Sequence, residues 1–263
     1  MAHRAPSPHP ALAAAADAAA SAFKEARAGF SRAALLEDIA DGADGTPTKR
    51  LDELVERAVL AAVEPYGLDV VSEEIGHVDR GSATSIVVDP VDGTGNAAAG
   101  IPVSAFTAAI AVDGRFTEGL THWLDLDRRW WAHVDEEVQP STTGRRSLDG
   151  AMVSMIRPKG DGGGFLAIAR RCDRIRVLGS SSIEAALVAD GVIDAALDAG
   201  SRTHRLVDLA AAVVLLERAG GTLVDVHGSP IEYTVEIDRR WSGVAAATPE
   251  LAAELIETIT SAA

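Results

Sequence analysis

Cysteine, lysine and aromatic residues are scarce in this chain of 263 residues. Its single cysteine, Cys172, excludes an internal disulfide and a cysteine-rich zinc site. No apolar run reaches the roughly 18 residues that a transmembrane helix needs. A signal peptide is not expected either, because Asp17, Lys24 and Glu25 interrupt the alanine-rich stretch near the N-terminus. We therefore expect a cytoplasmic protein.

Basic residues are outnumbered: 24 lysines and arginines face 39 aspartates and glutamates, and the formal net charge is −15. This charge argues against nucleic acid or an anionic membrane as a partner. Lysine occurs only at Lys24, Lys49 and Lys159. A low-lysine, Asp-rich composition fits either a high-salt cytoplasm, where salt screens self-repulsion, or a GC-rich genome, and composition alone does not separate the two.

Apolar residues make up 47% of the chain and no Pro/Ser-rich linker interrupts it, which predicts one large globular domain or two close lobes. Periodicity predicts helices in residues 11–36, 51–63, 181–188, 207–219 and 250–259, with a turn-rich loop in 41–48. Strands are expected in residues 68–71, 85–88, 105–112, 116–120, 175–178, 193–197 and 244–247. Turn residues and charges gather in residues 142–150, so we expect an N-terminal α+β lobe, residues 1–145, and a C-terminal α/β lobe, residues 146–263. The pattern indicates an α/β (α+β) fold, layered and with a mixed sheet.

Two carboxylates, Asp89 and Asp92, follow directly after the apolar run 86–88. Buried charge is costly unless it is paired or bound to metal. Pro90 is expected to end the strand between them, because proline has no N–H to donate to a neighbouring strand. A solvated turn, a metal site and a phosphate-binding loop are all compatible with Asp-Pro-x-Asp-Gly taken alone.

The residues around this pair favour a site that holds both metal and phosphate. If a helix begins at Asp92 or Gly93, the next free N–H groups suit a phosphate. Since carboxylates cannot face a phosphate directly, divalent cations must lie between them, and oxygen ligands select Mg²⁺ or Mn²⁺. Glu73 also follows an apolar strand, whereas Asp208 and Asp52 have helix capping as their alternative role.

In sequence order, Glu73-Glu74, Asp89-Pro-Val-Asp-Gly-Thr94 and Val207-Asp208-Leu-Ala-Ala resemble the inositol monophosphatase superfamily. The segments 44–49 and 72–76 look most like its archaeal-type branch, which includes dual inositol monophosphatase/fructose-1,6-bisphosphatases. The resemblance implies a layered α/β/α/β/α sandwich of the sugar-phosphatase type with mixed sheets, usually found as a homodimer. It also implies two or three Mg²⁺ ions per subunit, with Mn²⁺ as a substitute.

The resemblance further implies a role for each matched residue. Glu73, Asp89 and the carbonyl of Val91 would bind the first ion, while Asp89, Asp92 and Asp208 would bind the second; Glu73 would be shared with a weaker third ion. Thr94 and Asp52 look like the catalytic pair that orients the attacking water, with Glu73 also catalytic through its metal. Backbone N–H groups of Gly93 and Thr94, beside Asp92 and Gly95, would hold the phosphate.

Substrate contacts are expected in a second region. Gly179-Ser180-Ser181 resembles the family segment that touches substrate hydroxyls, with an ordinary helix N-cap as the alternative. Arg176 and Arg205 are candidates for a second phosphate, Arg205 preferred, with surface ion pairs as the alternative. Departures from the family pattern are Val207 in place of tryptophan, and the small residues Gly95 and Ala97–Ala99. The histidines His77 and His204 are expected at the surface.

The sequence therefore predicts a Mg²⁺-dependent phosphatase acting on a small phosphorylated polyol or sugar, inositol 1-phosphate and fructose 1,6-bisphosphate being the leading substrates. One alternative is a phosphatase for 3′-phosphoadenosine 5′-phosphate or NADP, but aromatics form only 4% of the chain and are absent from the expected substrate mouth. A second alternative, from another class, is a regulatory protein that binds metal and phosphate without turnover.

Overall fold

The computed structural model describes residues 7–139, 141–160 and 162–262. The helices are α1 (Pro10–Gly29), α2 (Arg32–Leu35), α3 (Arg50–Val63), α4 (Thr94–Ala99), α5 (Gly163–Ala169), α6 (Ser181–Ala189), α7 (Leu206–Arg218), α8 (Pro249–Thr260) and a 3₁₀ turn, Glu64–Tyr66. The strands are β1 (Asp38–Asp41), β2 (Pro47–Lys49), β3 (Asp69–Ser72), β4 (Gly76–Val78), β5 (Thr84–Asp92), β6 (Ala105–Val112), β7 (Arg115–Trp123), β8 (Arg128–His133), β9 (Met152–Met155), β10 (Arg174–Arg176), β11 (Ala195–Leu197), β12 (Thr222–Asp225) and β13 (Gly243–Ala246).

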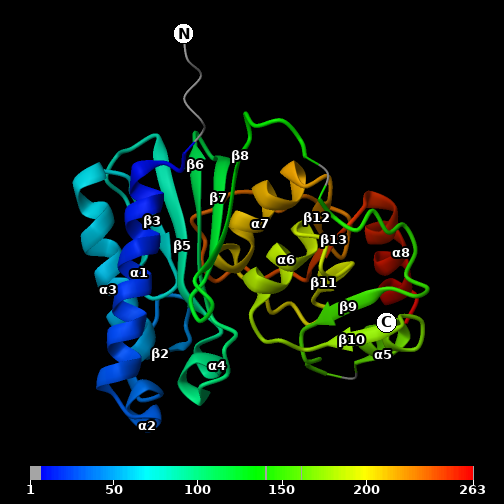
Figure 1. Cartoon of the computed structure of the whole chain (residues 1–263), viewed down its shortest axis with the longest axis horizontal. Coiled ribbons are helices and arrows are strands. Elements are labelled where there is room, and N and C mark those ends of the chain that lie inside the picture. Colours follow the sequence, from blue (N-terminus) through cyan, green and yellow to red (C-terminus); the bar gives the residue numbers. More distant parts are fainter. Residues whose placement is uncertain (1–6, 140, 161, 263) are drawn as a thin grey trace.

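These elements stack in five layers, α/β/α/β/α (Figure 1). Helices α1 and α3 cover the outer face of a six-stranded sheet, and α6 and α7 lie between that sheet and a five-stranded one. Helices α5 and α8 cover the far face of the second sheet. The layered sandwich predicted from the family resemblance is confirmed.

Both large sheets are mixed. The first has the order β4-β3-β5-β6-β7-β8, in which only β3 and β5 run parallel. The second has the order β10-β9-β11-β13-β12, in which β9 runs parallel to both of its neighbours. The predicted division at residues 145/146 falls between the strands of the two sheets, and as a boundary between lobes it stays a prediction.

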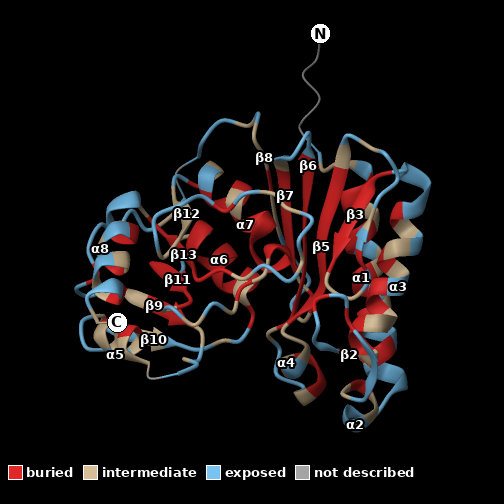
Figure 2. Ribbon diagram, turned by 180° about the vertical axis from the view of Figure 1, so that it is seen from behind, coloured by how far each residue is buried: buried red, intermediate tan, exposed pale blue. Residues whose placement is uncertain are grey.

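The apolar pattern of each helix matches its layer. In α3 the buried residues Leu51, Val55, Val59 and Val63 form one stripe toward the sheet, as expected for an outer helix. Helix α7 is buried on nearly every side because sheets lie on both sides of it (Figure 2). Gly119 of β7 lies so close to the backbone of α7 that a Cβ there would collide with it, so this contact requires glycine.

Several local predictions were wrong at their boundaries. The helix expected over residues 11–36 ends at Gly29 and is followed by the separate short helix α2. The turn-rich loop expected over residues 41–48 is largely the connection of the β1–β2 hairpin. Strand β5 does not end at Pro90 but continues to Asp92.

The prediction that both histidines are at the surface was half right. His77 is exposed, but His204 is buried, and its Nδ1 accepts a hydrogen bond from the Gly243 N–H at 3.0 Å. His204 also pairs with Trp241 in an isolated β-bridge, which brings its ring into the interior.

Across the described ranges, no helix is both long and apolar enough to span a membrane.

Candidate active site

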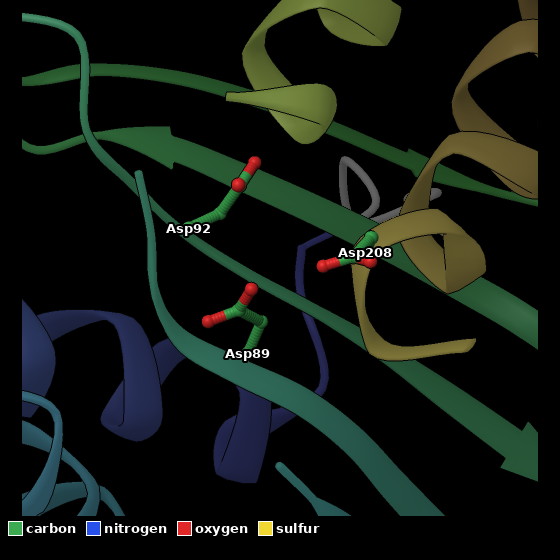
Figure 3. A group of neighbouring side chains, drawn as sticks. All are labelled: Asp89, Asp92 and Asp208. Carbon is green, nitrogen blue, oxygen red and sulfur yellow. The ribbon is translucent and has the colours of Figure 1, made fainter. Parts of the chain in front are cut away.

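The end of β5 carries the two aspartates of the Asp-Pro-x-Asp motif. In a regular strand, residues three positions apart point to opposite faces of the sheet. Here Asp89 pairs with Thr107 and Asp92 pairs with Ala105, so β5 uses one more residue than β6 over this stretch. A bulge of this kind changes the direction of the side chains that follow it, and it accounts for both carboxylates facing one point (Figure 3).

Asp208 joins them from the first turn of α7. One carboxylate oxygen from each of Asp89, Asp92 and Asp208 lies within 4.8 Å of the others, and all three residues are buried. The capping alternative for Asp208 is also present, because its Oδ2 accepts the Arg205 backbone N–H at 2.6 Å. Capping leaves its other oxygen available to the cluster, since a carboxylate accepts at both oxygens.

The electrostatics of this triad fit a divalent cation. Asp89 Oδ2 is buried and has no hydrogen-bond partner among the described residues, while Oδ1 accepts the Val91 N–H at 3.0 Å. Burial, followed by the charges of Glu73, Asp92 and Asp208, raises the pKa of Asp89 well above its usual value. Burial and the charge of Asp208 also raise the pKa of Asp92. Buried, mutually repelling oxygen ligands of this kind suit Mg²⁺ or Mn²⁺.

Glu73 lies next to the triad but is held by an arginine. It forms an ion pair with Arg205 Nη1, and the same nitrogen lies 3.1 Å from Asp44 Oδ2. Burial raises the pKa of Glu73 to about 8, although the charge of Arg205 opposes that rise. Arg205 thus contacts predicted metal ligands directly. An arginine in an ordinary surface ion pair would not be expected at this position.

The predicted Thr94–Asp52 pair is formed in the structure. Thr94 Oγ1 lies 2.7 Å from Asp52 Oδ1 and 3.0 Å from the carbonyl oxygen of Val91. Asp52 is in the first turn of α3, and burial raises its pKa to about 7 even though the hydrogen bond from Thr94 lowers it. A carboxyl group with a pKa near neutrality can accept or release a proton at physiological pH.

The loop after β5 packs closely against residues 103 and 179. Gly93 has φ +91°, and a Cβ there would lie 2.7 Å from the carbonyl oxygen of Val103 and 3.3 Å from that of Gly179. Glycine is therefore required at this position, from which α4 begins. Gly95 has no heavy atom within 4 Å of where its Cβ would be, so the small residue leaves open space.

The predicted serine segment meets this loop, but not in the expected way. Ser180 Oγ donates to Asp92 Oδ2 at 2.8 Å, and Ser182 donates to the same oxygen from both its N–H and its hydroxyl. Ser181 is the first residue of α6, and Gly179 before it has φ +78°. The serines therefore hold a predicted metal ligand in place, whatever contacts they make with substrate.

Arg176 shares no such contact. It is exposed on β10, and its Nη1 donates to the carbonyl oxygen of the neighbouring residue Ile175 at 2.8 Å. Its role in binding a second phosphate stays a prediction.

Comparison with known proteins assigns the family. The model of the inositol monophosphatase family matches residues 7–262, nearly the whole chain. The chain belongs to the inositol monophosphatase family. The geometry above is thus that of a family member whose acidic motifs converge as their order in the sequence suggested.

Relatives within the family share about a third of their residues with this member. The fructose-1,6-bisphosphatase/inositol-1-monophosphatase of Methanothermobacter thermautotrophicus is 33% identical over 251 residues, which cover 85% of this chain and 87% of the relative. The inositol-1-monophosphatase ImpA of Mycolicibacterium smegmatis is 31% identical, covering 80% and 79%. In fold, the crystal structure of an inositol monophosphatase–fructose 1,6-bisphosphatase gene product matches with a TM-score of 0.84 at 21% identity, covering 94% and 98%.

Sequence reasoning missed two polar residues that hold the segment 178–179, the buried Glu184 and the partly buried Asn96. Glu184 Oε1 accepts the N–H groups of Leu178 and Gly179 at 2.9 and 3.2 Å. From helix α4, Asn96 Nδ2 donates to the carbonyl oxygens of Leu178, Gly179 and Val103. A Ser-x-x-Glu pattern, Ser181 to Glu184, was the available signal for Glu184, because an acid at that spacing often reaches back to the N–H groups before a helix.

Glu184→Gln is expected to flatten the pH dependence of stability. Burial raises the pKa of Glu184 to about 7 from 4.5, so the folded state keeps a proton that the unfolded chain releases. The stability from this group is complete below its unfolded pKa and is lost as pH rises through the folded value, a change on the order of 3 kcal/mol.

Chemical denaturation of both proteins with EDTA present, from about pH 5 to about pH 8, measures this difference. Glutamine can still accept the two N–H groups but has no proton to lose, so the unfolding free energy should fall less steeply in the variant. Parallel curves for the two proteins would contradict the expectation.

Proposed function

We propose that this chain is a divalent-metal-dependent phosphatase that hydrolyses inositol 1-phosphate, fructose 1,6-bisphosphate or both. The observation that carries the proposal is the convergence of Asp89, Asp92 and Asp208, with one orphaned carboxylate oxygen, beside the Thr94–Asp52 pair. The substrate class is supported by the names of the relatives that align over most of this chain.

Different residues would hold the metal ions, orient the attacking water and bind the phosphate. Asp89, Asp92, Asp208, Glu73 and the Val91 carbonyl would hold two or three Mg²⁺ ions, and bound ions would neutralise phosphoryl oxygens and lower the pKa of the attacking water. Asp52 accepts a hydrogen bond from the Thr94 hydroxyl, which leaves the lone pairs of the Thr94 oxygen free to accept a hydrogen bond from the water that it orients. The N–H groups of Gly93 and Thr94 would donate to the phosphate. A homodimer and a cytoplasmic location, both drawn from the sequence and the family resemblance, remain predictions.

A substrate panel with the purified protein tests the proposal. Phosphate release should be seen from inositol 1-phosphate or fructose 1,6-bisphosphate with Mg²⁺ at about millimolar concentration, and it should vanish with EDTA. The same panel includes 3′-phosphoadenosine 5′-phosphate and NADP, at low and high KCl. Release from those nucleotides alone would replace the proposed substrates, and metal binding without any release would indicate the non-catalytic alternative.

A further inference from the structure

Arg205 and Asp44 form an arrangement at the edge of the metal centre that the proposed reaction does not use. Arg205 is the N-cap residue of α7, and its side chain is 21% exposed. Its guanidinium pairs with Glu73 through Nη1 and lies 3.4 Å from Asp208 Oδ1 through Nη2. A fixed positive charge therefore contacts two of the predicted metal ligands.

The buried carboxylate of Asp44 holds the Arg205 guanidinium in place. Asp44 Oδ2 lies 3.1 Å from Arg205 Nη1 and 2.9 Å from Arg240 Nη2, and the Asp44 side chain is 1% exposed. Because Asp44 comes from the connection of the β1–β2 hairpin and Arg240 from the segment before β13, the anchor is built from three distant parts of the chain. A guanidinium held this way cannot move far from Glu73 and Asp208 without breaking its bonds to Asp44.

The consequence for cation binding follows from charge alone. A guanidinium and a divalent ion attract the same carboxylate oxygens and repel each other, and in a partly buried site this repulsion is weakly screened. Within the described residues, Arg205 forms no ion pair with Asp89 or Asp92; it pairs with Glu73 and, within the triad, lies 3.4 Å from Asp208 alone. Arg205 should therefore weaken cation binding more at Glu73 than at the Asp89–Asp92–Asp208 triad.

We propose that Arg205, anchored by Asp44, is an internal counter-cation that competes with divalent ions for Glu73 and so weakens metal binding at that end of the site. The inference rests on the proposed metal dependence. Arg205 therefore increases the difference in metal affinity between a tighter position at the triad and a weaker position that includes Glu73.

The test is calorimetric titration of the metal-stripped protein with Mn²⁺. Arg205→Gln should tighten the weaker phase of Mn²⁺ binding by about tenfold or more, and Arg205→Lys, which keeps the charge, should stay within about threefold of wild type. Asp44→Asn removes a nearby negative charge, while Arg205 keeps its contacts to Glu73 and Asp208, so this variant should weaken Mn²⁺ binding. Misfolding would change the Mn²⁺ affinity of Arg205→Gln and Asp44→Asn in the same direction. Affinity changes of opposite sign therefore distinguish charge competition from structural damage.

Thermal melts provide a second readout. Without metal, Arg205→Gln should melt lower than wild type, because Asp44, Glu73 and Asp208 lose their neighbouring positive charge. Mn²⁺ should raise the melting temperature of the variant by more than it raises that of wild type. Arg202→Gln is the matched control, since Arg202 is exposed and forms no ion pair within residues 7–139, 141–160 and 162–262. It should change neither measurement.

Unchanged or weaker Mn²⁺ binding in Arg205→Gln overturns the inference while leaving the proposed function intact. A wild-type protein that binds no Mn²⁺ overturns the proposed function, and this inference with it.

Discussion

Asp92→Asn is expected to abolish phosphate release while the fold is preserved. Asp92 Oδ2 accepts three hydrogen bonds, from Ser180 Oγ at 2.8 Å and from the N–H and hydroxyl of Ser182 at 2.7 and 2.6 Å. The amide oxygen of asparagine can accept the same bonds, so the link between β5 and the start of α6 survives. The variant loses a negative charge and a ligand oxygen, and kcat should fall by more than about 10³-fold.

Phosphate release, calorimetric Mn²⁺ titration and thermal melts measure this expectation together. Metal-free Asp92→Asn should be at least as stable as wild type near neutral pH, because burial and the neighbouring Asp208 raise the pKa of Asp92 and its charge is therefore unfavourable there. Asp113→Asn is the control: Asp113 is exposed in the turn between β6 and β7 with φ +48°, a conformation that asparagine tolerates. Wild-type turnover in Asp92→Asn would contradict the proposed function.

Thr94→Ala is expected to lower kcat by roughly 10² to 10³-fold without changing metal binding. Its hydroxyl connects Asp52 Oδ1, at 2.7 Å, with the carbonyl oxygen of Val91, at 3.0 Å, and the alanine variant removes that connection together with the γ-methyl group. The three converging carboxylates and the Val91 carbonyl remain, so calorimetric Mn²⁺ affinity should stay within about threefold of wild type.

Two further variants separate orientation of water from packing. Thr94→Ser keeps the hydroxyl and should recover most of the activity, and Asp52→Asn should resemble Thr94→Ala. Since the two residues act as one unit, the double variant should lose little more than either single variant. An inactive Thr94→Ser with intact metal binding would mean that the methyl group, rather than the hydroxyl, matters at this position.

Much of the fold could be predicted because periodicity is a local property. Strand β6 was predicted with its observed bounds, and α6, α7 and α8 within about a residue or two at each end, the usual uncertainty of helix ends. Short or irregular elements were missed, among them the β1–β2 hairpin and α5, because a few residues carry no recognisable period. The break of the first helix at Gly29 was missed because alanine-rich sequence continues on both sides of it.

For the site, the sequence by itself determined which chemical groups are present: strand-end carboxylates at Asp89 and Asp92, a glycine turn at Gly93, a hydroxyl at Thr94 and a distal acid at Asp208. Their order was enough to indicate the family, because each motif is a short contiguous stretch. The family resemblance also implied the Thr94–Asp52 pair, which the structure brings within hydrogen-bond distance.

Only the tertiary structure decided how those groups face one another. The bulge in β5 turns Asp89 and Asp92 toward one point, although their spacing in a regular strand would separate them. Asn96 holds the segment 178–179 because packing brings it 82 residues along the chain to Leu178, and Arg205 was placed against Glu73, 132 residues away in the sequence. Contacts between distant residues depend on how the layers pack, and no local pattern of the chain encodes that packing.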